Sequence, residues 1–132
     1  MKLITRDTDY ALRAICFIAK SKEEVVSVAG LVKKLKIPRP FLRKLLQILN
    51  KERILKSYKG QGGGFSLAVK PGRIFLADLI EIFQGPLSLN ECFFKKMSCP
   101  NKDTCALKRK IDSIERYVVK ELEAITIESL LR

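Results

Sequence analysis

Histidine is absent from this chain of 132 residues, and basic side chains far outnumber acidic ones. Without histidine, the chain lacks the side chain that most often acts as a general base near neutral pH. It also shows no nucleophile at a characteristic spacing from a base. The sequence therefore predicts a protein that is not an enzyme and has no small-molecule substrate.

Long apolar segments are absent too. No run approaches the ~18 residues that a membrane-spanning helix needs, and the N-terminus lacks the apolar core of a signal peptide. Hydrophobic residues still make up 47% of the chain, which is enough for a buried core. We expect a cytoplasmic protein without a membrane partner. In that compartment thiols stay reduced, and clustered cysteines more often bind metal than form disulfides.

The excess of positive charge lies mainly in one segment. The chain carries 26 Lys and Arg against 14 Asp and Glu, a formal net charge of +12. Residues 31–70 hold eleven of these cations and one acid, whereas residues 101–132 hold seven cations and six acids. A concentrated basic segment without a wide apolar helix face favours a nucleic acid over a membrane surface. We expect the partner to be double-stranded DNA.

A first helix is expected over residues 8–20, with Thr8 or Asp7 as its N-cap. Its apolar residues recur at helical spacing and form a core-facing stripe, made of Ala11, Ala14, Ile15 and Ile18. Cys16 lies away from that stripe. We interpret its thiol as a small apolar group in a helix contact.

Two short helices joined by a tight turn follow. Ser27 is the predicted N-cap of a helix over residues 28–36, and Pro38 ends it because proline cannot donate a backbone hydrogen bond. A second helix is expected from Pro40 to Leu49, since proline suits a first helical position. The pair predicts a helix-turn-helix whose second helix is the recognition helix.

The expected recognition helix carries cations at its start. Arg39, Arg43 and Lys44 lie in its first turns, the part that usually meets base edges in the major groove. Arginine can form a bidentate pair with guanine, whereas lysine more often contacts phosphate. A solvated cationic face is the ordinary alternative. The coincidence of the charge with a helix-turn-helix favours DNA contacts.

Two strands are expected next, over residues 53–58 and 64–69, around a glycine-rich turn. Glycines supply positive φ angles and let a backbone approach a phosphate closely. A hairpin directly after a recognition helix predicts the wing of a winged helix. The glycine run is not a nucleotide-binding loop, because no Gly-Lys-Ser/Thr follows it. The wing residues expected to reach DNA are Tyr58, Lys59, Gly60, Gln61 and Gly62.

A further helix is expected over residues 74–83, ending at Gly85-Pro86. The residues that we expect to face inward on it are Phe75, Leu76, Leu79, Ile80 and Phe83.

One continuous last helix is expected, with Asp103 or Thr104 as its N-cap. Its apolar residues recur at steps of three and four, namely Leu107, Ile111, Ile114, Val118, Leu122 and Ile125. So narrow a seam suits a partner helix better than a broad core, which predicts a homodimer. The fold class is thus mostly α with a small β-hairpin. We expect a winged helix-turn-helix in residues 1–86, and a cysteine-rich loop with a dimerisation helix in residues 87–132.

Three of the four cysteines fall within one short segment. Cys92, Cys99 and Cys105 are separated by six and then five residues. Clustered thiolates suit a soft metal or an iron–sulfur cluster, and the spacing differs from the Cys-x-x-Cys pairs of most structural zinc sites. Structural zinc, free thiols and a regulatory disulfide are the alternatives. A cluster usually takes four protein ligands, so Cys16 or a carboxylate is needed as the fourth.

These features together resemble the IscR and NsrR type of iron–sulfur-dependent transcription regulators over nearly the whole chain. The motifs that carry the resemblance are Thr8-Asp9-Tyr10-Ala11-Leu12-Arg13, Ile37-Pro38, Lys59-Gly60-Gln61-Gly62-Gly63-Gly64-Phe65, Gly85-Pro86 and the three-cysteine segment. The resemblance implies a homodimeric DNA-binding regulator, mostly acting as a repressor. It also implies a 4Fe–4S or 2Fe–2S cluster on the three cysteines that senses cluster status, iron, nitric oxide or redox stress.

The resemblance also bears on the fourth ligand. IscR-like members have a histidine three residues after the third cysteine, where this chain has Lys108. A protonated lysine cannot ligate, so that arrangement is excluded. NsrR-like members use an aspartate of the partner's first helix, which matches Asp9. Arg43 stands where IscR has a glutamate, so the IscR operator sequence does not carry over.

Overall fold

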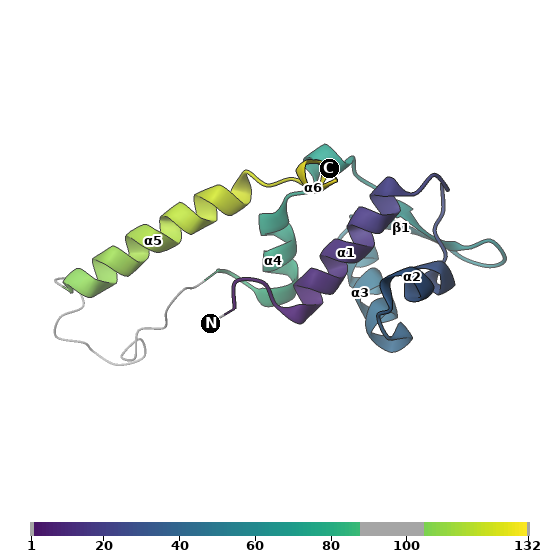
Figure 1. Cartoon of the computed structure of the whole chain (residues 1–132), viewed down its shortest axis with the longest axis horizontal. Helices are drawn as coiled ribbons and strands as arrows, with labels where there is room; N and C mark the ends of the chain where they lie inside the picture. Colours follow the sequence, from purple (N-terminus) through teal and green to yellow (C-terminus); the bar gives the residue numbers. More distant parts are fainter. Residues whose placement is uncertain (1, 88–104, 132) are drawn as a thin grey trace.

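The computed structural model describes residues 2–87 and 105–131. A compact head is followed by a long helix that projects from it (Figure 1). The elements in chain order are α1 (Arg6–Lys20), α2 (Val28–Leu35), α3 (Arg39–Lys51), β1 (Leu55–Tyr58), β2 (Gly64–Leu67), the 3₁₀ turn η1 (Pro71–Arg73), α4 (Leu76–Gln84), α5 (Ala106–Glu123) and α6 (Ile127–Leu130). The predicted fold class, mostly helical with a small β-hairpin, is confirmed.

α1 begins earlier than expected. Its N-cap is Thr5, whose hydroxyl accepts a hydrogen bond from the backbone N–H of Thr8 at 3.4 Å. Thr8 is fully buried, and its hydroxyl donates to the side chain of Gln84 at 2.7 Å. The prediction of Thr8 or Asp7 as the N-cap is therefore wrong. Thr8 lies inside the helix, where its hydroxyl binds Gln84 instead of capping. The predicted apolar stripe of α1 is confirmed as buried.

The helix-turn-helix lies where the sequence predicts it. The hydroxyl of Ser27 caps α2 by accepting from the N–H of Gly30 at 3.0 Å. α2 ends at Leu35, one residue early, because Lys36 adopts the left-handed conformation with φ 57°. Pro40 is the second residue of α3, and α3 continues past the predicted end to Lys51.

The hairpin is antiparallel and shorter than predicted, with Tyr58 opposite Gly64 at the turn. An isolated bridge joins it to the segment before α2: the N–H of Val26 donates to the carbonyl of Phe65 at 2.9 Å, and the reverse bond is 2.8 Å. A Cβ at Gly64 would lie 2.1 Å from the carbonyl oxygen of Val26. Glycine is therefore required at this close approach.

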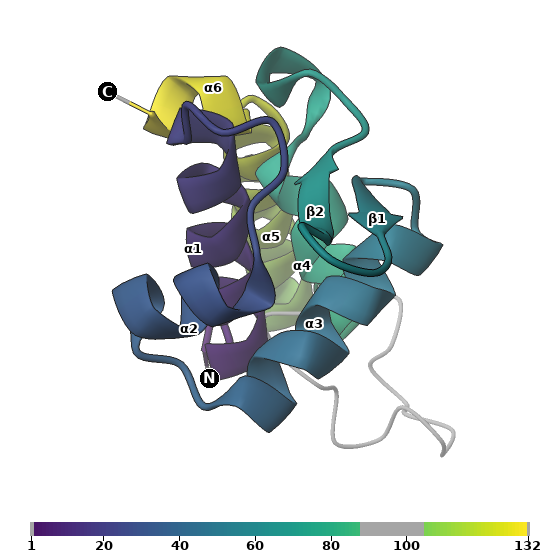
Figure 2. The same ribbon diagram turned by 90° about the vertical axis from the view of Figure 1, so that its right-hand side faces the viewer.

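The main core lies where α1 packs against α3 and α4 (Figure 2). Its large side chains include Ile15, Leu31, Leu46, Leu79 and Ile127, all fully buried. Because Ile127 belongs to α6, the end of the chain contributes to the core of the head.

The predicted continuous last helix is interrupted. α5 ends at Glu123, and Ile125 lies in the connection to α6 rather than in a helical seam. Thr126 caps α6 and pairs with Phe75 in an isolated antiparallel bridge. The prediction that Phe75 faces inward is wrong, because Phe75 precedes α4 and is 37% exposed.

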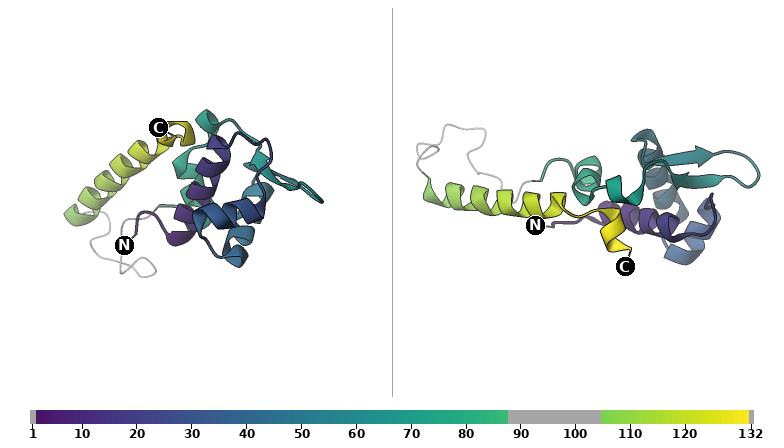
Figure 3. Two further views of the ribbon diagram at one scale, coloured as in Figure 1. Left: turned by 45° about the vertical axis from the view of Figure 1, so that its right-hand side comes forward. Right: turned by 90° about the horizontal axis from the view of Figure 1, so that it is seen from above.

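The chain therefore leaves the head and returns to it. α5 contacts α4 near its C-terminal end, where Leu122 packs with Leu76 and Ile80. The opposite end of α5 lies away from the head (Figures 1 and 3). Among the described helices, none combines the length and apolarity needed to cross a membrane.

Candidate functional site

α3 presents two contrasting faces. Leu42, Leu45, Leu46 and Leu49 are buried against the head, so the cations between them must point outward. The predicted DNA-contacting residues Arg39, Arg43 and Lys44 are accordingly exposed. This arrangement is geometrically suited to major-groove insertion, because the buried face fixes the helix while the charged face stays free.

The tip of the hairpin supplies a second exposed surface. The predicted wing residues Tyr58, Lys59, Gly60, Gln61 and Gly62 are all exposed. Gly60 and Gly62 have φ angles of 86° and 77°, and added Cβ atoms there would meet nothing within 4 Å. Their role is thus conformational, since they allow the turn that carries Lys59 outward.

A groove of about 420 Å³ separates α3 from the hairpin. Gln47 and Asn50 line its α3 side, and Tyr58 and Lys59 line its wing side. Sequence reasoning missed Gln47 and Asn50, although they follow Arg43 by four and seven residues and so share its helix face. Their amide groups give this part of the surface neutral hydrogen-bonding capacity beside the cations.

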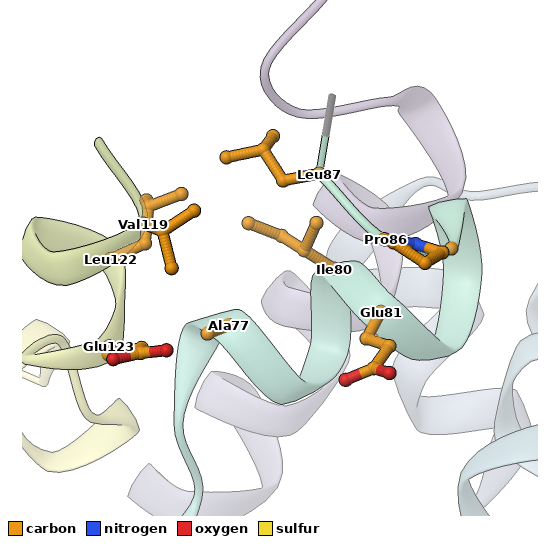
Figure 4. Close-up of a pocket in the computed structure, with 9 residues that line it drawn as sticks. Ala77, Ile80, Glu81, Pro86, Leu87, Val119, Leu122 and Glu123 are labelled. Atoms are coloured by element: carbon orange, nitrogen blue, oxygen red, sulfur yellow. The ribbon is translucent and has the colours of Figure 1, made fainter. Parts of the chain in front are cut away.

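A second cavity, of about 180 Å³, lies between α4, α5 and the segment Gly85–Leu87. Figure 4 shows Ile80, Leu87, Val119 and Leu122 around it. The segment Gly85–Leu87, where the chain leaves the head, therefore lies beside the C-terminal end of α5.

Cys105 is the one predicted cluster ligand of the cysteine segment that falls among the described residues; Cys92 and Cys99 lie outside them. It is the N-cap of α5, and its Sγ accepts a hydrogen bond from the backbone N–H of Lys108 at 3.4 Å. The ammonium of Lys108 is engaged with Asp112 at 2.8 Å. Cys105 therefore presents its sulfur to the backbone N–H groups at the start of α5.

Asp9 lies in the first turns of α1. Its carboxylate accepts from Nε of Arg13 at 2.9 Å, and both side chains are substantially exposed. Such an exposed pair is weak and open to exchange. Asp9 is on the head, whereas α5 begins at its end remote from the head (Figure 1). Within one chain, the structure does not bring Asp9 and Cys105 together.

Cys16, the alternative fourth ligand, is partly buried and packs against the main core. Burial raises the pKa of its thiol above the ordinary value, which opposes thiolate formation. Across residues 2–87 and 105–131, no three side chains of His, Cys, Asp or Glu converge as metal ligands would.

Residues 4–132 match the model of the Rrf2 family, described as iron-dependent transcriptional regulators. The transcriptional regulator NsrR of Oceanobacillus iheyensis is 32% identical over 127 residues, which cover 95% of this chain and 86% of the relative.

Solved structures show the same similarity. CymR, the global cysteine regulator of B. subtilis, has a TM-score of 0.81 at 27% identity, covering 99% of this chain and 97% of CymR. IscR of T. potens has a TM-score of 0.76 at 23% identity, covering 99% of this chain and 86% of IscR. The predicted winged-helix architecture is confirmed by these structures.

Proposed function

The chain belongs to the Rrf2 family, and we propose that it is a homodimeric repressor that senses iron, nitric oxide or redox stress through an iron–sulfur cluster. Family membership makes it a DNA-binding transcription regulator. The prediction that it is not an enzyme is confirmed by the same relatives, which are transcription regulators.

The exposed cationic face of α3 carries the DNA-binding part of the proposal. We assign base contacts to Arg39 and Arg43, and phosphate contacts to Lys44 and Lys59. Tyr58, Gly60, Gln61 and Gly62 complete the wing, which would contact the adjacent backbone. Two heads related by a two-fold axis would then read a two-fold site.

The proposed dimer follows from α5. Leu107, Ile114 and Tyr117 are 66%, 52% and 66% exposed, although all three are large and apolar. A second copy of the helix would remove these side chains from water. We propose residues 1–86 as the DNA-binding part and residues 87–132 as the cluster and dimerisation part, with Ile127 of the latter packed into the core of the former.

The proposed cluster ligands are Cys92, Cys99, Cys105 and Asp9 of the partner subunit, in a 4Fe–4S or 2Fe–2S site. Cys105 presents its sulfur at the start of α5, and the exposed Asp9 carboxylate is accessible to another chain. When bound, the cluster supplies a centre whose state responds to iron and oxidants. Because Asp9 and Cys105 lie apart within one chain, such a site needs two subunits.

A second candidate function keeps the DNA binding and omits the cluster. The structural similarity to CymR motivates this candidate, because the description of CymR names cysteine and not iron. In that case the cysteine segment holds structural zinc or no cofactor.

Anaerobic purification distinguishes the two candidates. Brown protein with visible absorption and equal iron and sulfide contents supports the cluster. Colourless protein that contains zinc or no metal supports the alternative. Binding of promoter DNA by cluster-loaded and cluster-free protein then tests sensing: equal affinities would disprove the coupling.

A further inference from the structure

Arg6, the first residue of α1, is stacked against the first turn of the recognition helix. Its guanidinium carbon lies 5.1 Å from the ring centroid of Phe41 and 6.0 Å from that of Tyr10. Both distances are within the range of a cation–π contact. Phe41 is the third residue of α3 and is 45% exposed. The stack is therefore on the surface, and Phe41 lies between Arg39 and Arg43 in the sequence of α3.

The guanidinium carbon lies over the rings of Phe41 and Tyr10. Arginine donates hydrogen bonds from the edge of its planar group, so an aromatic ring against the face does not consume them. The side chain of Arg6 is 62% exposed. Its ion pair with Asp7 is long, at 3.8 Å, and half-exposed, so it competes weakly for the edge.

We infer that Arg6 is a further DNA-contacting residue, held by Phe41 so that its guanidinium edge binds a backbone phosphate beside the recognition helix. This inference rests on the proposed insertion of α3 into the major groove. The edge of a guanidinium matches a phosphate group through two parallel hydrogen bonds. An arginine already ordered by stacking loses less conformational freedom on binding than a mobile one.

The position of Arg6 is consistent with this role. When the N-terminal turns of a recognition helix meet the bases, the phosphates that flank the groove lie beside those turns. α1 is fixed there, because the N-cap of α1 is joined to Gln84 of α4 by a 2.9 Å hydrogen bond from the backbone N–H of Thr5. The ordinary alternative is that Arg6 only covers an exposed ring.

Salt titration of binding to a mixed-sequence DNA duplex separates the alternatives, because each phosphate contact contributes about 0.9 to the slope of log K against log salt concentration. We expect Arg6→Ala to make the slope shallower by roughly 0.9 and to weaken binding. Arg73→Ala is the matched control. Arg73 is exposed on η1, which packs against α6 on the opposite side of the head from α3 (Figure 2).

Phe41→Leu tests the role of the ring. It keeps the charge of Arg6 but removes the stack, so we expect binding to weaken roughly two- to fivefold with little change in slope. Arg6→Lys should likewise keep the slope while weakening binding. Thermal unfolding of each variant checks that the fold is intact.

Equal slopes for the Arg6→Ala and Arg73→Ala variants would overturn the inference. Arg43→Ala shows which proposal has failed. If it weakens binding while Arg6→Ala has no specific effect, Arg6 is not a contact and α3 remains the reading helix. If neither change matters, the proposed insertion of α3 fails as well.

Discussion

The side-chain oxygen of Gln84 accepts a hydrogen bond from the hydroxyl of Thr8 at 2.7 Å, across 76 positions of sequence. The same oxygen accepts from the backbone N–H of Thr5 at 2.9 Å, and the amide nitrogen of Gln84 donates to the carbonyl of Leu3 at 3.2 Å. Gln84 is the last residue of α4, directly before Gly85. The start of α1 is thus fastened to the point where the chain departs towards the cysteine segment.

Replacing Gln84 with leucine should destabilise the head. The change leaves the buried Thr8 hydroxyl without this acceptor, which costs about 1–3 kcal/mol. Urea unfolding followed by circular dichroism measures the loss. Gln47→Leu makes the same change at an exposed position and should shift stability by only about 0.5 kcal/mol. Similar losses in both variants would mean that the buried hydrogen bonds contribute little.

Gly64→Ala should disrupt the attachment of the wing. The new Cβ would collide with the carbonyl of Val26, whose hydrogen bonds with Phe65 hold the hairpin to the head. We expect a loss of roughly 3 kcal/mol in unfolding free energy. Gly60→Ala is the control: nothing lies within 4 Å, and its positive φ alone costs about 1 kcal/mol. Equal effects would contradict the steric explanation.

Ile114→Asp should shift the proposed dimer towards monomer. It places a charge in the exposed apolar seam of α5, and burying that charge without a partner is unfavourable. Sedimentation velocity over a range of concentrations gives the result. Ser113→Asp adds the same charge to the neighbouring exposed residue and should leave the association unchanged. A dimer that survives Ile114→Asp would place the interface elsewhere.

Asp9→Ala should shorten the lifetime of the proposed cluster. Asp7→Ala is the matched control, because it removes a carboxylate from the same end of α1. The decay of visible absorption after exposure to air, followed with the iron content, compares the two variants. Identical decay in both would remove Asp9 from the ligand set.

Cys105→Ala should prevent cluster assembly altogether, since it removes a thiolate ligand.

The thiol of Cys16 should make stability depend on pH in the alkaline range. Burial raises its pKa in the folded chain, so the folded state holds the proton more tightly than the unfolded state. Stability from this group is therefore present below the ordinary thiol pKa of about 8.5 and is lost as pH rises through the raised value. Urea unfolding at increasing pH should show a steeper decline for the natural chain than for Cys16→Ala. Parallel declines would contradict this prediction.

Local signals predicted much of the DNA-binding head. Ser27 caps α2 as its chemistry predicts, and the apolar spacing of α3 leaves Arg43 and Lys44 exposed. The glycine run predicted the hairpin, because tight hairpin turns need positive φ angles and glycine adopts them most readily. These features depend on residues close together in sequence.

The errors concern contacts between distant residues. Thr8 resembles a helix cap, and only its partnership with Gln84 explains why it is buried instead. Thr126 similarly ends the apolar seam of α5, because it pairs with Phe75 of the head. The stack of Arg6 on Phe41 joins two helices and leaves no periodic pattern in either one.

The bridge between Phe75 and Thr126 gives α5 the mechanical character of a lever with a fastened base. The lever is about 27 Å long at 1.5 Å per residue for 18 residues, and Cys105 caps its far end. The N–H of Ile127 donates to the carbonyl of Ile74 at 2.9 Å, so the fastening continues into α6. A chain cut after Glu123 would keep every proposed cluster ligand and every proposed DNA contact. It would lose the bridge to Phe75 and the buried side chain of Ile127 from the core of the head, although Leu122 would still contact α4.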